Sequence, residues 1–307
     1  MKFLIAILLS AAVAGAEEPK RPLITGVSHI ALFVHDVERS REFYKDFLGF
    51  EEPFSLNNPD GSLSLTFIKI NDRQYIELFP EKEAGTDRLN HISIETDDAE
   101  AMRKYLGGHG VKVPDHVPKG RIGNSNFNVK DPEGHTVEIV QYEPDGWSMR
   151  EKGKFMSNAR VSKHAMHVGI IVTHLDAEMK FYHDLLGFQE FWRGAGGEGK
   201  VLSWINMRVP DGQDYIEFML YKAPPDPVRR GSAHHVALEV SNIDEAKAML
   251  EAKPARKDYT KPLEIRTGTN RKRQMNLFDP DGTRSELMEP KTVDGVPAPS
   301  STAPPPQ

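Results

Sequence analysis

The sequence predicts an α+β fold made of four related βαββ-type modules, two in each half of the chain. Three observations predict it: a long internal repeat, a strand-helix-strand order inside each repeat unit, and proline- and glycine-rich breaks between the halves. With 307 residues, the chain is long enough for about two domains, each with a substantial apolar core.

The internal repeat aligns without a gap over its first part. The stretch HIALFVHDVERSREFYKDFLGFEE begins at His29 and matches HVGIIVTHLDAEMKFYHDLLGFQE, which begins at His167. Matched segments continue to the turns DPEG at Asp131 and DPDG at Asp279. Because duplicated segments fold alike, we expect two similar halves. The expected limits are 24–142 for the first domain, 143–163 for a linker and 164–290 for the second domain.

The elements of the first module follow from local patterns. Residues 24–34 alternate as a strand, which places Val27 and His29 on the same face. Residues 37–48 carry aromatic and apolar pairs four positions apart, as a helix does, and Gly49 provides its stop. A hairpin is expected from the strand patterns at 63–70 and 74–79.

The two ends of the chain carry different signals. Residues 1–16 run from a charged Lys2 through an apolar stretch to Ala-Gly-Ala, which is typical of a secretory signal peptide. The alternative, a membrane anchor, is disfavoured because the apolar run is short for a bilayer. We therefore expect a secreted or periplasmic protein without a membrane anchor. Residues 291–307 are rich in proline and serine and are expected to form a disordered tail.

Composition excludes several functions. The chain has no cysteine, which removes disulfides, thiolate metal ligands and a cysteine nucleophile. The net charge of -6 argues against nucleic-acid binding, and the basic run at 271–273 is too short to change this. Any metal must then be held by nitrogen and oxygen. The expected partner is a small-molecule substrate, and the sequence does not indicate an oligomeric state.

Histidine and glutamate recur at matched positions in the four modules. Each histidine lies on an opening strand, and each glutamate follows 47 to 51 residues later on a closing strand. A single such pair is usually a half-exposed strand histidine with a solvated carboxylate. Four matched pairs instead indicate cation sites, since a carboxylate within an apolar strand is costly to bury alone. The candidate metal ligands are His29, Glu77, His91, Glu138, His167, Glu217, His235 and Glu286.

These histidine-initiated strands, the segments FYKDFLGF and FYHDLLGF, and the two DPxG turns resemble the vicinal oxygen chelate superfamily, which includes glyoxalase I, extradiol dioxygenases and bleomycin-resistance proteins. The resemblance covers nearly all of residues 24–290. It implies four βαβββ modules, paired into two curved-sheet cups that each surround a metal. Adjacent modules are joined in some members and exchanged in others, so the pairing stays open here.

The expected cofactor is a divalent metal, with Zn, Ni, Mn and Fe(II) all compatible with two histidines and two glutamates. A glyoxalase-like lyase or isomerase is favoured, because a metal-bound carboxylate that can release is able to move a proton. The catalytic candidates are Glu77, Glu138, Glu217 and Glu286. If only three ligands are used, the resemblance favours the glutamate of the later module.

Two other functions stay open. Extradiol ring cleavage is disfavoured because that branch carries a tyrosine three positions before the DPxG aspartate, where this chain has Asn128 and Asn276. A non-catalytic binding or resistance protein would not need the matched ligand sets. One half could also be active while the other supports the fold, and the sequence does not separate the halves, since each retains all four candidate ligands.

Overall fold

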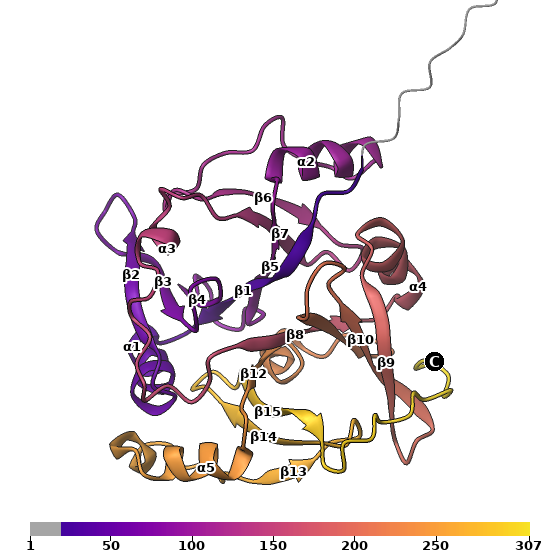
Figure 1. Ribbon diagram of the computed structural model, residues 1–307. Coiled ribbons are helices and arrows are strands. Elements are labelled where there is room, and N and C mark those ends of the chain that lie inside the picture. The colour runs from indigo at the N-terminus through magenta and orange to yellow at the C-terminus, as the bar shows by residue number, and fades with distance from the viewer. Residues whose placement is uncertain (1–19) are drawn as a thin grey trace, which may run out of the picture.

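The computed structural model describes residues 20–307, so the signal peptide expected over 1–16 lies outside the described residues. Two curved mixed sheets, one from each half of the chain, lie next to one another (Figure 1). The expected α+β fold with two similar halves is confirmed. Between residues 20 and 307, no helix has the length and apolar character needed to cross a membrane.

The first sheet has seven strands in the order β2-β3-β4-β1-β5-β7-β6. Strands β1 and β5, the openings of the first two modules, pair antiparallel at the centre, and each also pairs parallel with the closing strand of its module. The strands are β1 (Ile24–Val34), β2 (Glu51–Asn57), β3 (Leu63–Lys69), β4 (Tyr75–Pro80), β5 (Leu89–Thr96), β6 (Ser125–Lys130) and β7 (Thr136–Gln141).

The second sheet repeats this plan in the order β13-β14-β15-β12-β8-β11-β10-β9. Its strands are β8 (Ala165–Val172), β9 (Gln189–Gly196), β10 (Val201–Arg208), β11 (Tyr215–Leu220), β12 (His235–Glu239), β13 (Ile265–Thr267), β14 (Lys272–Phe278) and β15 (Arg284–Thr292). Adjacent modules therefore share a sheet in both halves, which answers the open question of pairing. The second module differs from the expected βαβββ order, because an isolated bridge between Lys119 and Ser125 stands where the first strand after the helix is expected.

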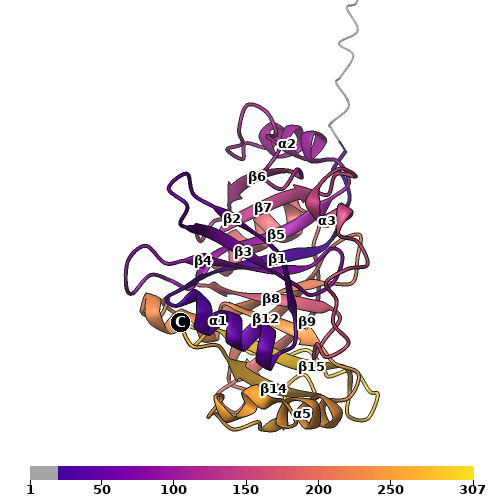
Figure 2. The same ribbon diagram turned by 90° about the vertical axis from the view of Figure 1, so that its left-hand side faces the viewer.

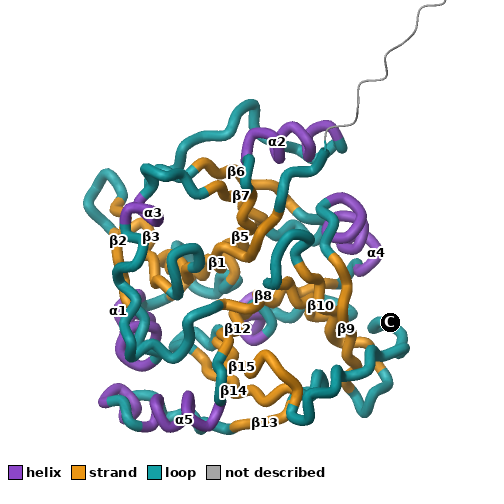
Figure 3. Tube along the Cα trace, in the orientation of Figure 1, coloured by secondary structure: helices purple, strands orange, loops and turns teal. Residues whose placement is uncertain are grey.

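Short helices surround the sheets (Figure 3). Helices α2 and α5 lie at opposite ends of the molecule (Figures 1 and 2). The helical elements are α1 (Val37–Arg41), the π-helix η1 (Glu42–Phe47), α2 (Ala99–Gly108), α3 (Trp147–Arg150), α4 (Leu175–Glu178), the π-helix η2 (Met179–Leu185), the 3₁₀ helix η3 (Pro227–Ser232), α5 (Ile243–Glu251) and the 3₁₀ helix η4 (Pro254–Lys257).

The helix expected over 37–48 forms, but its second half is wider than an α-helix. Asp36 caps its start by accepting hydrogen bonds from the backbone of the first turn. From Glu42 the hydrogen bonds span five residues, as in the bond from the Leu48 N–H to the Phe43 carbonyl. Gly49 then ends the helix at φ +85°, which a residue with a side chain adopts only with strain.

A β-bulge corrects one facing prediction in β1. The register with β5 shifts between Val27 and His29, so one extra residue is accommodated there. Val27 consequently packs in the main core with Ile30 and Leu32. The expectation that Val27 shares the face of His29 is wrong, because simple alternation does not anticipate the extra residue.

The two halves are joined by reciprocal contacts between helices and DPxG turns. The Tyr44 hydroxyl of η1 donates to Asp279 in the second half at 3.2 Å. The Tyr182 hydroxyl of η2 donates to Asp131 in the first half, also at 3.2 Å. Because both tyrosines are fully buried, the turns fix how the halves sit against each other.

The C-terminal tail differs from the disorder expected over 291–307. It runs beside β9 and β10, where the Leu202 N–H donates to the Pro304 carbonyl at 2.8 Å and the Ser301 N–H donates to the Arg193 carbonyl at 2.9 Å. A proline-rich segment cannot form a core of its own, but its backbone carbonyls can accept hydrogen bonds from strand N–H groups near the edge of a sheet.

Candidate metal centres

The eight residues singled out from the sequence come together in two groups of four. In the first half they project from the four central strands, β4, β1, β5 and β7. In the second half the equivalent strands are β11, β8, β12 and β15. We call the two groups the N-terminal cluster (His29, Glu77, His91 and Glu138) and the C-terminal cluster (His167, Glu217, His235 and Glu286).

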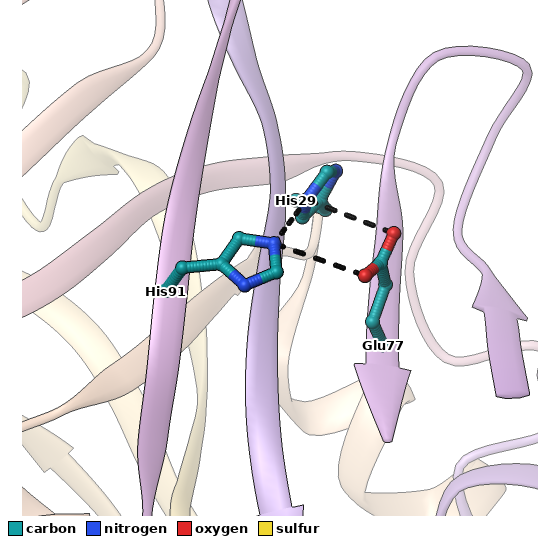
Figure 4. Close-up of side chains that lie close together, drawn as sticks. All are labelled: His29, Glu77 and His91. Carbon is teal, nitrogen blue, oxygen red and sulfur yellow. Dashed lines mark hydrogen bonds and ion pairs between the residues drawn. The ribbon is translucent and has the colours of Figure 1, made fainter. Parts of the chain in front are cut away.

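Potential ligand atoms of the N-terminal cluster face one another. The Nε2 atoms of His29 and His91 are 2.9 Å apart. Glu77 directs Oε1 toward His29 at 3.6 Å and Oε2 toward His91 at 3.8 Å, and Figure 4 shows these three side chains converging from three strands. Glu138 completes the group, with Oε2 at 3.3 Å from His91 and 3.8 Å from His29.

The C-terminal cluster has nearly the same geometry. The Nε2 atoms of His167 and His235 are 3.1 Å apart. Glu286 Oε2 lies 3.5 Å and 3.6 Å from these two nitrogens, and Glu217 Oε2 lies 4.0 Å and 3.6 Å from them. All eight side chains are buried, with at most 9% of any residue exposed.

These separations fit a divalent ion. Ligand bonds of about 2.1 Å place neighbouring ligand atoms about 3.0 Å apart in octahedral and about 3.4 Å apart in tetrahedral geometry. Candidate ligand atoms lie within 4.8 Å of one another in His29, Glu77 and His91, and likewise in His167, His235 and Glu286. The ligand assignment itself stays a prediction, which the grouping supports.

Hydrogen bonds orient both histidines of the N-terminal cluster. Tyr142 donates to the Arg73 carbonyl at 2.8 Å, so its oxygen accepts from the Ser28 hydroxyl at 2.6 Å. Ser28 Oγ in turn accepts from His29 Nδ1 at 3.3 Å. On His91, Nδ1 lies 3.0 Å from Asn90 Oδ1 and donates to it. In the neutral imidazoles, this leaves the Nε2 lone pairs available to a metal ion.

Electrostatics in the N-terminal cluster also favour a cation. Burial lowers the pKa of His29 to about 3, which keeps its imidazole neutral. Burial raises the pKa of Glu77 to about 8, with the nearby charge of Glu138 acting in the same direction. Burial lowers the pKa of His91, but the Glu138 carboxylate more than offsets this, and the net direction is upward. The cluster therefore attracts positive charge, either a proton or a metal ion.

One cavity reaches the C-terminal cluster, and another lies one side chain away from the N-terminal cluster. A cavity of about 740 Å³ is lined by Phe33, Phe79 and Asn90, of which Phe79 packs edge-on to His91. A smaller cavity of about 240 Å³ reaches Glu217 and Glu286 directly and is lined by Trp192, Trp204 and Arg284 among others. A small molecule therefore has room directly beside the C-terminal cluster and, beyond Phe79 and Asn90, near the N-terminal cluster.

Several supporting residues were not singled out from the sequence. Ser28 and Asn90 each precede a predicted ligand, and this adjacency was the available signal. Tyr142 is distant in the sequence and gave none. His164 and His234 lie outside both clusters: His164 contacts Asp214 and Glu239, and His234 contacts Asp87.

Comparison with known families and proteins gives a consistent result. The model of the Glyoxalase/Bleomycin resistance protein/Dioxygenase superfamily matches residues 26–139 and 164–287, one match in each half. The chain is 29% identical over 124 residues to a lactoylglutathione lyase of Haemophilus influenzae, a span covering 38% of this chain and 91% of that protein. It is 30% identical over 130 residues to Glyoxylase I 4 of Arabidopsis thaliana, covering 40% and 75% of the two proteins.

Solved structures resemble the whole chain. A Mn(II)-bound glyoxalase from Novosphingobium aromaticivorans has a TM-score of 0.68 at 18% identity, covering 92% of this chain and 88% of that one. An extradiol ring-cleaving dioxygenase from B. fuscum has a TM-score of 0.66 at 18% identity, covering 94% of this chain and 77% of that one. At 18% identity, the likeness to these structures shows that the chain has their tandem fold.

Proposed function

The chain belongs to the Glyoxalase/Bleomycin resistance protein/Dioxygenase superfamily, and we propose that it is a divalent-metal-dependent lyase or isomerase acting on an oxygen-bearing small molecule. One observation carries the proposal. Two histidine Nε2 atoms lie 2.9 Å apart with two carboxyl groups around them, and the lone pairs of these groups repel one another unless a proton or a metal ion lies among them.

Each member of the N-terminal cluster has a role in this proposal. A bound metal would supply Lewis-acid polarisation of a substrate oxygen. His29 and His91 hold the ion in a fixed orientation through their hydrogen-bonded Nδ1 atoms. Of Glu77 and Glu138, one moves a proton between substrate atoms while the other stays with the histidines. Burial keeps water from competing for that proton.

The surroundings of Glu138 favour proton transfer over ring cleavage. Asn128 lies opposite Glu138 in the β6–β7 register, and its side chain is exposed. The ring-cleaving branch, which the sequence resembles less closely, would have a tyrosine hydroxyl at this position. An amide cannot serve as a proton donor in the way a phenol does.

Export is part of the proposal and rests on the signal-peptide pattern of residues 1–16. It makes a glutathione adduct, which is chiefly cytosolic, a less suitable substrate than another hydroxycarbonyl compound. N-terminal sequencing of the protein from cells would test it: a mature chain starting at Glu17 supports export, and a chain that still carries residues 1–16 contradicts it.

The direct test is proton exchange. Protein reconstituted with Mn²⁺ or Zn²⁺ is incubated in D₂O with a panel of hydroxyketones and aldehyde-thiol adducts, and mass spectrometry measures deuterium gained at the carbon beside the carbonyl. We expect metal-dependent exchange that falls by about 10²-fold or more in Glu77→Gln or Glu138→Gln. The matched control is Glu198→Gln, an exposed glutamate in the turn between β9 and β10 whose ion pair is with Lys200.

Two results would contradict the proposal. Oxygen consumption with catechols and no exchange with any carbonyl compound would assign the dioxygenase reaction instead. Binding of these compounds without exchange or oxygen uptake would assign a binding protein. Equal exchange by the wild type and both cluster variants would show that the glutamates do not move the proton.

A further inference from the structure

The two clusters share their residue types but differ in their charged neighbours. Thr136 stands two residues before Glu138, whereas Arg284 stands two residues before Glu286. A second difference lies four residues before the asparagine paired with each glutamate: the first half has Asn124, just before β6, and the second has Lys272, at the start of β14. Two neutral residues of the first half thus correspond to two cations near the C-terminal cluster.

Arg284 contacts the nitrogen of His235 that would hold a metal. Its Nη2 lies 2.9 Å from Nδ1 and 3.0 Å from Nε2 of this histidine. Nδ1 is 2.7 Å from the Ala233 carbonyl, which can only accept, so Nδ1 carries the proton. Because Nη2 is almost equally far from the two ring nitrogens, it lies off the direction of the Nε2 lone pair, but it places the guanidinium charge within 3.0 Å of Nε2. A metal ion bound at Nε2 would therefore lie close to a positive charge that repels it.

Charge balance separates the clusters in the same way. For residues 20–307, the ion pairs of Glu77 and Glu138 are all with the two histidines, so no lysine or arginine offsets these carboxylates. Burial raises the pKa of Glu217, and the charges of Arg284 and Lys272 are among those that lower it. Two positive side chains thus balance the two carboxylates of the C-terminal cluster, and a divalent ion would upset that balance.

The support of the histidines differs as well. His29 Nδ1 has Ser28 as its partner, whereas the equivalent residue before His167 is Met166, a side chain without a hydroxyl. His167 Nδ1 is buried and has no hydrogen-bond partner in the part of the chain that the structure describes. Histidines that bind metal nearly always donate their other ring N–H to a partner.

We infer that the N-terminal cluster holds the only tightly bound divalent ion of the chain, and that Arg284 takes the place of a metal in the C-terminal cluster. The inference rests on the proposed function to the extent that both require a bound metal. It adds that the two halves have diverged in chemistry although each keeps two histidines and two glutamates.

Metal stoichiometry tests the inference without measuring activity. Purified untagged protein is loaded with Zn²⁺ or Mn²⁺, freed of loose metal by gel filtration and measured by mass spectrometry of the metal. We expect about one ion per chain, retained in Glu286→Gln and lost in Glu138→Gln. The double variant Arg284→Thr with Lys272→Asn, which carries the residues of the first half, should gain a second ion. Circular dichroism verifies that each variant is folded.

The outcomes separate the two proposals. No ion in the wild type overturns the proposed function together with the inference. Two ions in the wild type, or an ion lost in Glu286→Gln but kept in Glu138→Gln, overturns the inference alone. A folded double variant that still binds a single ion shows that Arg284 and Lys272 are not what excludes metal, and so also overturns it.

Discussion

Replacing Ser28 with alanine should weaken metal binding without removing any ligand. The Ser28 hydroxyl accepts from His29 Nδ1 at 3.3 Å and donates to Tyr142 at 2.6 Å. In Ser28→Ala, His29 Nδ1 loses its partner and resembles His167 Nδ1, which has none within residues 20–307. Loss of such a supporting hydrogen bond typically reduces metal affinity by about 10- to 100-fold, or about 1.4–2.7 kcal/mol.

A chelator competition titration measures this change as a shift in the dissociation constant of the metal. The matched control is Ser93→Ala, because Ser93 is paired with His29 in the β1–β5 register, is fully buried and has an Oγ without a hydrogen-bond partner in the described chain. We expect the control to bind metal within about twofold of the wild type. Equal affinities for Ser28→Ala and wild type would refute the role of the Ser28–Tyr142 pair in orienting His29.

Two further predictions concern stability. His164 contacts Asp214 at 2.7 Å and Glu239 at 3.0 Å, and the Asp214 hydrogen bond, against burial, raises its pKa to about 9. The stabilisation that His164 contributes is therefore complete below pH 6.5 and is lost as the pH rises through about 9. His164→Gln should lower the free energy of unfolding in urea by about 1 kcal/mol at pH 6 and by almost nothing at pH 10, after allowance for solvent screening. A cost that does not change with pH would contradict this. Lys69 is fully buried, donates to the Glu151 and Lys154 carbonyls and pairs with Asp72, so Lys69→Met should cost about 2–4 kcal/mol in the same assay. The exposed control Lys200→Met should cost about 0.5 kcal/mol or less, and equal costs for both would exclude an anchoring role for Lys69.

Much of the fold was predictable because its signals are local and repeated. The alternation over 24–34 matches β1, and the helix pattern over 37–48 ends at Gly49 as expected. Matched histidines and glutamates on strands must lie near one another once the strands form a sheet. This is why all eight predicted site residues fall into two groups.

Other features depend on packing that no local pattern encodes. Strand pairing decided which modules share a sheet, and a bulge moved Val27 to the core face. The contact between Ser28 and Tyr142 spans 114 positions. Alternation places Arg284 on the face of Glu286, since they are two residues apart, but which atom its guanidinium meets depends on the folded cup.

Anomalous diffraction from crystals loaded with Mn²⁺ or Zn²⁺ tests the N-terminal metal centre most directly. We expect one strong peak about 2.0–2.3 Å from the Nε2 atoms of His29 and His91 and bonded to at least one of the two glutamates, Glu77 or Glu138. No comparable peak should lie between His167 and His235. Absence of a peak between His29 and His91 in fully loaded crystals would contradict the metal centre, and with it the proposed chemistry.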